Sequence, residues 1–186
     1  MLGIGRPARA LDQILTVHSP VLGLWAVLVR FVVTAATSLL ALHLLGRAPF
    51  FPSYLTFLPN ERYYGAEIYF LPAFGAGVWL LGSALVHLIV RCAGRPSDMD
   101  GILNVIGFGL LVVGPAVWLL DWSCIALGVE GRGWIAIPQA AIAGWQTALF
   151  ALGFVRLLQV RWWAALVLAA LVTGGVYIPL AMIFIR

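Results

Sequence analysis

Two histidines that lie inside hydrophobic stretches, His43 and His87, are the residues best suited to hold a cofactor, because paired imidazoles ligate haem iron. Their positions argue against this chemistry. His43 falls near the outer end of the first predicted membrane span and His87 near the inner end of the second, so helix rise separates them by roughly 20 Å. His18 could share the inner surface with His87, but hydrogen bonding between helices or exposure at the interface is the favoured interpretation. We therefore expect no cofactor.

Ser83 and His87 are spaced i, i+4 on one face of a predicted helix, with Arg91 one turn further on. As a nucleophile and its base they would also need an orienting acid and an oxyanion site, and no acidic residue is predicted at that depth in any span. The sequence contains neither HExxH nor GxSxG, and its glycine groups match no phosphate- or dinucleotide-binding loop. We therefore predict no catalytic residue, and we expect that the protein is not an enzyme.

The two cysteines, Cys92 and Cys124, lie at the ends of different predicted spans. The predicted topology puts them on opposite sides of the membrane, where they cannot pair. The sequence has neither a CxxC motif nor a cluster of cysteine and histidine. No metal site is therefore expected.

The elements that carry these side chains are predicted to be membrane-spanning helices. Of the 186 residues, 63% are hydrophobic and 10% are charged, with a mean hydropathy of +1.03, which excludes a water-soluble fold. Residues 68–90 carry no charge at neutral pH and are long enough to cross a hydrocarbon core of about 30 Å. The predicted fold is all-α: a polytopic membrane protein with five transmembrane helices. The spans are predicted at about 21–45, 67–91, 102–122, 135–155 and 162–185.

Domain organisation follows from these spans. Residues 21–186 are predicted to form one membrane domain, with the other spans packed around the second one. Residues 1–20 are predicted to form an N-terminal interfacial segment. Gly114 and Pro115 predict a kink near the middle of the third span. The short link at 156–161 predicts a tight antiparallel hairpin of the last two spans.

The second span carries small residues between positions 73 and 82, which predict close approach of a neighbouring helix. Arg30 lies about a third of the way into the first span, where it is expected to snorkel to the nearer membrane surface. Asp121 is expected to end the third span outside the hydrocarbon.

The other notable polar residues within the spans are neutral, namely Asn104, Gln139, Gln146, Thr147 and Thr173. Proton- or ion-coupled carriers usually place a charged residue in the middle of the membrane. On these expectations the spans lack one, which argues against such a carrier.

Arginine sets the predicted orientation, since positive residues accumulate in short cytoplasmic loops. All eleven basic residues are Arg and the net charge is +4. With the N-terminus inside, most of these arginines are cytoplasmic. We expect a multi-pass protein of the cell membrane, with its N-terminus cytoplasmic and its C-terminus on the opposite side. Because the arginines fall between hydrophobic runs and do not gather on one face, no nucleic-acid partner is expected.

A short polar turn at residues 91–100 joins the second and third spans on the predicted cytoplasmic side. We interpret the charged groups of this turn, with the histidine that precedes it, as a candidate interaction surface for other membrane proteins. Its residues are His87, Arg91, Arg95, Asp98 and Asp100.

The run HLIVRCAGRPSDMDGILNVIGFGLLVVGP resembles the pattern of the Yip family, the Ypt/Rab-interacting membrane proteins and their prokaryotic relatives. In that family a span ending in a basic residue leads to a Gly-containing polar turn and then to a span with a Gly and a Pro. The matching residues are His87, Arg91, Gly94, Gly107 and Pro115. The acidic-Tyr-Gly-Pro signature of the eukaryotic members is absent, so the resemblance points to a prokaryotic-type member. It implies five spans with a cytoplasmic N-terminus and association with other membrane proteins.

From these observations the first functional hypothesis is a non-catalytic scaffold or accessory subunit. Its expected partners are the lipid bilayer, other membrane proteins or further copies of the chain. The first alternative is a small transporter or lipid-handling subunit that builds its pathway with partners. The second alternative is an intramembrane redox or hydrolytic enzyme.

Overall fold

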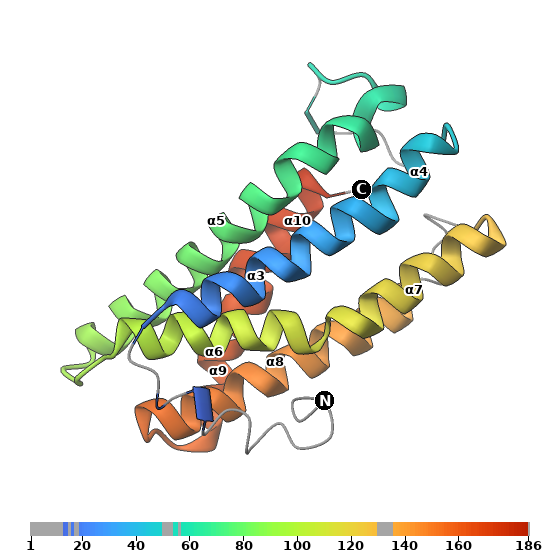
Figure 1. The fold of residues 1–186 in the computed structure, drawn as a ribbon. Coiled ribbons are helices and arrows are strands. Elements are labelled where there is room, and N and C mark those ends of the chain that lie inside the picture. Colours follow the sequence, from blue (N-terminus) through green and yellow to red (C-terminus); the bar gives the residue numbers. More distant parts are fainter. Residues whose placement is uncertain are drawn as a thin grey trace.

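The computed structural model describes residues 13, 14, 16, 19–49, 54, 55, 57–129 and 136–185, and its regular elements are all helices (Figure 1). Five helical stretches are long and apolar enough to cross a membrane. We call them spans 1 to 5, and they cover Val21–Leu44, Asn60–Cys92, Met99–Leu127, Ala136–Leu158 and Trp162–Phe184. The prediction of an all-α polytopic protein with five transmembrane helices is confirmed. Most of the predicted interfacial segment, residues 1–20, lies outside the described residues.

Four of the spans contain more than one helical segment. Span 1 comprises α3 (Val21–Thr34), the π-helical segment η1 (Ala35–Leu39) and α4 (Leu40–Leu44). Span 2 comprises the 3₁₀ turn η2 (Asn60–Arg62) and α5 (Tyr63–Cys92), and span 3 comprises α6 (Met99–Val112) and α7 (Gly114–Leu127). Span 4 is α8 (Ala136–Leu158), and span 5 comprises α9 (Trp162–Ala170), the π-helical segment η4 (Leu171–Tyr177) and α10 (Ile178–Phe184).

The spans form a bundle (Figure 1), and spans 2 and 3 each pack against three of the other spans. Span 1 packs against both of them, span 4 packs against spans 3 and 5, and span 5 packs against spans 2 and 4. The predicted hairpin of spans 4 and 5 is confirmed, since only three residues separate Leu158 from Trp162. Gln159 makes this sharp turn with a positive φ of 49°.

Span 3 is broken near its middle, as Gly114 and Pro115 predict. Helix α6 ends at Val112 and α7 begins at Gly114, with Pro115 in its first turn. A proline lacks the N–H that would continue the hydrogen-bond ladder, so the axis changes direction there. Figure 1 shows α7 diverging from the line of α6. The break divides the span into two halves with different neighbours.

Two spans are longer than the sequence pattern predicted, and this places two acidic residues within helices. Span 2 starts at Asn60, so Glu67 lies inside it and is fully buried. Span 3 continues to Leu127, which places Asp121 six residues before its end, about 9 Å by helix rise. Both acids, which were predicted at the limits of their spans, therefore lie further inside the helices than expected. The helices continue past these acids because apolar residues on both sides of each still pack in the bundle.

Spans 1 and 3 approach each other through glycines. A Cβ atom added at Gly107 would lie 2.4 Å from the backbone oxygen of Gly23, and one at Gly23 would lie 2.6 Å from that of Leu103. Neither position has space for a side chain, so α3 and α6 meet backbone to backbone. Such contacts stabilise helix pairs in membranes through van der Waals packing. In span 2, Gly75 packs under Phe31, which confirms part of the predicted small-residue contact.

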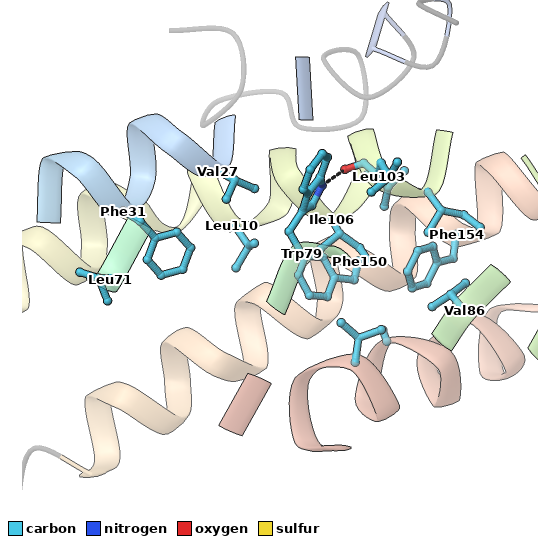
Figure 2. Packing of buried hydrophobic residues seen from close by; sticks show 14 of the residues in the cluster. Val27, Phe31, Leu71, Trp79, Val86, Leu103, Ile106, Leu110, Phe150 and Phe154 are labelled. Atoms are coloured by element: carbon cyan, nitrogen blue, oxygen red, sulfur yellow. Dashed lines mark hydrogen bonds between the residues drawn. The ribbon is translucent and has the colours of Figure 1, made fainter. Parts of the chain in front are cut away.

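The interior is filled by large apolar side chains from all five spans (Figure 2). Phe31, Ile106 and Phe150 are each at most 2% exposed. Trp79 of α5 donates its indole N–H to the backbone oxygen of Leu103 at 2.7 Å, drawn as a dashed line in Figure 2. This bond satisfies the one polar atom of a buried tryptophan and fixes span 2 against span 3.

Candidate functional site

The predicted interaction turn is built from helix caps. Gly94 ends α5 with a φ of 72°, and its N–H donates to Arg91 O at 3.0 Å. The next N–H, of Arg95, donates to Val90 O at 3.2 Å, which completes a Schellman motif. Asp98 is the N-cap of α6 and accepts a hydrogen bond from the N–H of Gly101 at 3.2 Å. Gly94 and Asp98 therefore have a structural role as caps of α5 and α6.

The five predicted interaction residues lie in or beside this turn. His87 Nδ1 forms a hydrogen bond with Ser97 Oγ at 3.0 Å, tying the end of span 2 to the turn. Arg91, Arg95 and Asp98 are exposed, and Asp100 is half-buried. Their side chains remain accessible at one end of the bundle. Binding of a partner there stays a prediction.

The two described histidines are far apart. A Cβ atom added at Gly65 would lie 2.9 Å from the His43 ring, so His43 sits at that level of α5. His87 follows Gly65 by 22 residues in α5, which is about 33 Å by helix rise. They cannot share a haem. His18 lies outside the described residues.

Ser83 and His87 do not form a nucleophile and base. Ser83 is fully buried and its hydroxyl has no hydrogen-bond partner among the described residues. His87 uses Nδ1 to contact Ser97. Within the described part of the chain, no group of three or more His, Cys, Asp and Glu residues could hold a metal ion.

Asn104, one of the predicted polar residues within a span, holds two helices together. It is fully buried, and its Oδ1 accepts a hydrogen bond from the N–H of Gly23 at 2.9 Å. Its Nδ2 donates to Ser19 O at 2.9 Å. The first N–H groups of a helix have no partner within that helix. Asn104 therefore caps α3 from α6, which is a structural role.

A second neutral group lies between spans 4 and 5. Thr147 Oγ1 lies 3.0 Å from Thr173 Oγ1 and donates to Ala143 O at 2.8 Å. Gln146 is 4% exposed, and its Nε2 has no hydrogen-bond partner among the residues described. Gln139, near the start of α8, is exposed. This second group carries no charge.

The most unusual group in the bundle is Arg30, which points inwards. Its side chain is 5% exposed, and Nη1 donates to Thr34 Oγ1 one turn along α3. The guanidinium carbon lies 5.6 Å from the centroid of the Phe31 ring and 5.8 Å from that of Trp118. The expectation that Arg30 snorkels to a membrane surface is wrong, because a hydroxyl and two aromatic faces receive it inside the protein.

The break in span 3 makes room for this arginine. A Cβ atom added at Gly114 would lie 3.0 Å from Arg30 Cδ, so the aliphatic part of the side chain passes over the glycine. On the same half-span, Trp118 donates its indole N–H to Thr34 Oγ1 at 2.9 Å. The Thr34 hydroxyl itself donates to Arg30 O at 2.9 Å. This hydroxyl thereby uses its one donor and both acceptor positions.

The hydrogen bond between Thr34 and Trp118 aligns span 1 with span 3, and so places the next residues on these two helix faces near each other. Ser38 follows Thr34 by four residues and Asp121 follows Trp118 by three, so each pair shares a helix face. Asp121 accordingly interacts electrostatically with Arg30 and with the Ser38 hydroxyl, although Ser38 does not reach normal hydrogen-bond geometry. Asp121 itself is half-buried.

Spans 2 and 5 complete the surroundings. Tyr177, the last residue of η4, interacts electrostatically with both Arg30 and Asp121. Its ring centroid lies 6.4 Å from that of Phe74 in α5, which in turn lies 6.0 Å from Phe31. We call the whole group the polar centre. It consists of Arg30, Thr34, Ser38, Trp118, Asp121 and Tyr177.

Arg30 holds the polar centre well away from both ends of span 1. Arg30 lies nine residues after Val21 and fourteen before Leu44, about 14 Å and 21 Å from the two ends of span 1. Charged residues at such depth are costly, and in membrane proteins they mark ligand or ion pathways. One signal for the centre was present in the sequence: Arg30, Thr34 and Ser38 recur every four residues along a single face.

The fold defines a multi-pass membrane protein with five helical spans. Compared with known proteins, the chain matches no family model, no curated protein and no solved structure. Membership of the Yip family therefore stays a prediction. The polar centre is the feature on which a functional proposal can be based.

Proposed function

We propose that this protein binds a small polar group within the membrane and moves it, as a small transporter or a lipid-handling subunit. One observation carries the proposal: the buried Arg30 and the half-buried Asp121 are close enough to interact electrostatically. If the two charged residues only stabilised the fold, apolar residues would serve as well, since replacing buried charged groups by apolar residues is often neutral or stabilising. The main sequence argument against a transporter was the lack of such charges, and it no longer holds.

The helices around the polar centre add support. Span 3 breaks at Gly114, directly beside Arg30, and π-helical segments η1 and η4 contribute Ser38 and Tyr177. Broken membrane helices commonly line substrate sites, and π-helical turns are frequent at functional sites. The break in span 3 and the two π-helical segments of the described spans thus meet one group of polar residues.

The test is flux in reconstituted vesicles. Purified protein is inserted into phosphatidylcholine vesicles, and two readouts are taken: uptake of labelled polar solutes, and movement of a fluorescent phosphatidylcholine between leaflets. Arg30→Gln is compared with Arg95→Gln, which removes the charge of an exposed arginine in the turn. We expect protein-dependent flux in one readout, reduced about tenfold or more by Arg30→Gln, as loss of a charge-assisted hydrogen bond implies. Arg95→Gln leaves it unchanged.

Equal flux in the wild type and Arg30→Gln would show that transport does not depend on the polar centre. No flux in either readout would remove the proposal for these substrates. Asn104→Leu is unsuitable as a probe of transport, because Asn104 caps α3 and its loss affects the fold.

The second candidate is the scaffold or accessory subunit, and a specific surface favours it. Ala140, Gly144 and Ala148 recur every four residues on the exposed face of α8. A Cβ atom added at Gly144 would meet nothing within 4 Å. Small residues with this spacing allow another helix to approach closely. The exposed charges of Arg91 and Arg95 offer a further contact outside the membrane.

Gentle extraction followed by native mass measurement tests this second role. A larger complex that is lost in Gly144→Leu and kept in Val167→Leu, an exposed substitution on span 5, would support it. A monomer for the wild type would contradict it. We also propose, from the arginine distribution, that the protein lies in the cell membrane with a cytoplasmic N-terminus, and that neither role involves catalysis.

A further inference from the structure

The Arg30 guanidinium has more hydrogen-bonding capacity than its neighbours use. Arginine carries five N–H donors in a planar fork. Among the described residues, one hydrogen bond engages them, from Nη1 to Thr34 Oγ1. The guanidinium carbon also lies over the rings of Phe31 and Trp118, which supply no oxygen acceptor for its N–H groups. The fork can therefore donate to a further acceptor.

Asp121 provides an opposite charge that does not contact the arginine. The two groups interact electrostatically. In the part of the chain that the structure describes, however, no nitrogen of Arg30 comes within 4.0 Å of a carboxylate oxygen. Asp121 is half-buried and Arg30 is buried, so the carboxylate is the more accessible of the two groups.

Charge balance selects the kind of ligand. With one positive and one negative group, the polar centre is neutral as a whole. Inside a membrane, an unpaired charge is unfavourable because the surroundings solvate it poorly. A simple anion or a simple cation would leave the occupied centre with a net charge. A ligand that carries both charges keeps it neutral and pairs with both groups.

We propose that the polar centre binds a zwitterion, whose anionic group accepts hydrogen bonds from Arg30 and whose cationic group lies against Asp121. This inference rests on the proposed function, because it names the ligand class of the same site. The aromatic ring of Tyr177, which interacts electrostatically with Asp121, suits the cationic end, since such rings attract alkylammonium groups. The zwitterion has two possible sources, a phospholipid headgroup or a free solute.

Equilibrium dialysis against protein in detergent micelles tests the ligand class. The probe is isotopically labelled glycerophosphocholine, a soluble zwitterion with no net charge. Glycerol phosphate, an anion, and choline, a cation, are the two comparison probes. We expect glycerophosphocholine to bind about tenfold or more tightly than either single-charge probe. Arg30→Gln and Asp121→Asn should each weaken its binding by about thirtyfold or more, as expected when one partner of a buried charge pair is removed.

Glu61→Gln and Arg95→Gln are the matched controls, since both remove an exposed charge outside the polar centre. Neither should change binding. To separate the two sources, the protein is also placed in phosphatidylcholine nanodiscs and the lipid that stays bound is counted by native mass spectrometry. Retained lipid that Arg30→Gln releases identifies a headgroup. Dialysis binding without retained lipid identifies a free solute.

Equal binding of the three probes, or tighter binding of glycerol phosphate, would overturn the inference. So would unchanged glycerophosphocholine binding in Asp121→Asn. If vesicle flux depends on Arg30 while these probes fail, the zwitterion inference falls and the proposed function stands. If glycerophosphocholine binds as expected while flux is absent, the zwitterion inference stands and transport falls.

Discussion

Trp118 donates its indole N–H to the Thr34 hydroxyl at 2.9 Å, across the boundary between spans 1 and 3. This bond links the second half of the broken span to the residue that also binds Arg30. Without it, α7 would be held near span 1 by few contacts, because it diverges from α6 after Gly114 (Figure 1). The pair therefore positions Asp121 relative to Arg30.

Replacing Trp118 by phenylalanine removes this donor and keeps a ring over the arginine. We expect a loss of about 1 kcal/mol in the free energy of unfolding, the usual value for a hydrogen bond between membrane helices. Unfolding by a denaturing detergent measures it. Trp163→Phe, at a position 54% exposed, is the control and should change little. Equal effects of the two substitutions would mean that the indole N–H stabilises nothing.

Asn104→Leu removes the cap of α3 and the bond to Ser19 while keeping a side chain of similar size. The N–H of Gly23 is then buried without its partner, which costs about 1 to 3 kcal/mol. The same unfolding assay should show this loss. Gln139→Leu, an exposed residue on α8, should stay within about 0.5 kcal/mol of the wild type. A wild-type stability for Asn104→Leu would contradict the capping role.

Gly107→Ala inserts a methyl group where the backbone of Gly23 lies 2.4 Å away. Both partners are backbone atoms of packed helices, so α3 and α6 must separate. We expect destabilisation of about 1 to 3 kcal/mol, as for other overpacked positions. Gly144→Ala is the matched control, because its added methyl group meets nothing within 4 Å. Comparable stability of the two variants would show that α3 and α6 are not in close contact.

Orientation can be tested with the native cysteines, Cys92 and Cys124, which both carry a thiol. Cys92 is the last residue of span 2 and is exposed, whereas Cys124 is buried in span 3. If the N-terminus is cytoplasmic, a membrane-impermeant maleimide should label Cys92 in inside-out vesicles and not in intact cells. Cys124→Ser should keep this pattern. Labelling of Cys92 from outside the cell would reverse the proposed orientation.

The sequence predicted those parts of the fold that depend on local patterns. Long apolar runs predicted the five spans, Gly114 and Pro115 predicted the break, and the short link before Trp162 predicted the last hairpin. Each of these follows from residues close together in the chain. The ends of spans 2 and 3 were less accurate, because an acidic residue was assumed to mark the limit of the hydrocarbon.

The polar centre was missed for a different reason. Position in a span gives the depth of Arg30, but whether it points to lipid or into the bundle depends on helix rotation. That rotation is set by distant contacts, such as the passage of the side chain over Gly114 and the bond from Trp118 to Thr34. Asp121 belongs with Arg30 because spans 1 and 3 are neighbours in the bundle. No local pattern reveals that contact.

A double-mutant cycle on Arg30 and Asp121 tests the central claim, that these residues form one centre inside the membrane. Arg30→Met, Asp121→Asn and the double variant are compared with the wild type by unfolding in detergent. We predict a coupling energy of about 1 kcal/mol or more, with the double variant more stable than the sum of the single losses implies. Additive losses within about 0.3 kcal/mol would show two independent residues and would contradict the account.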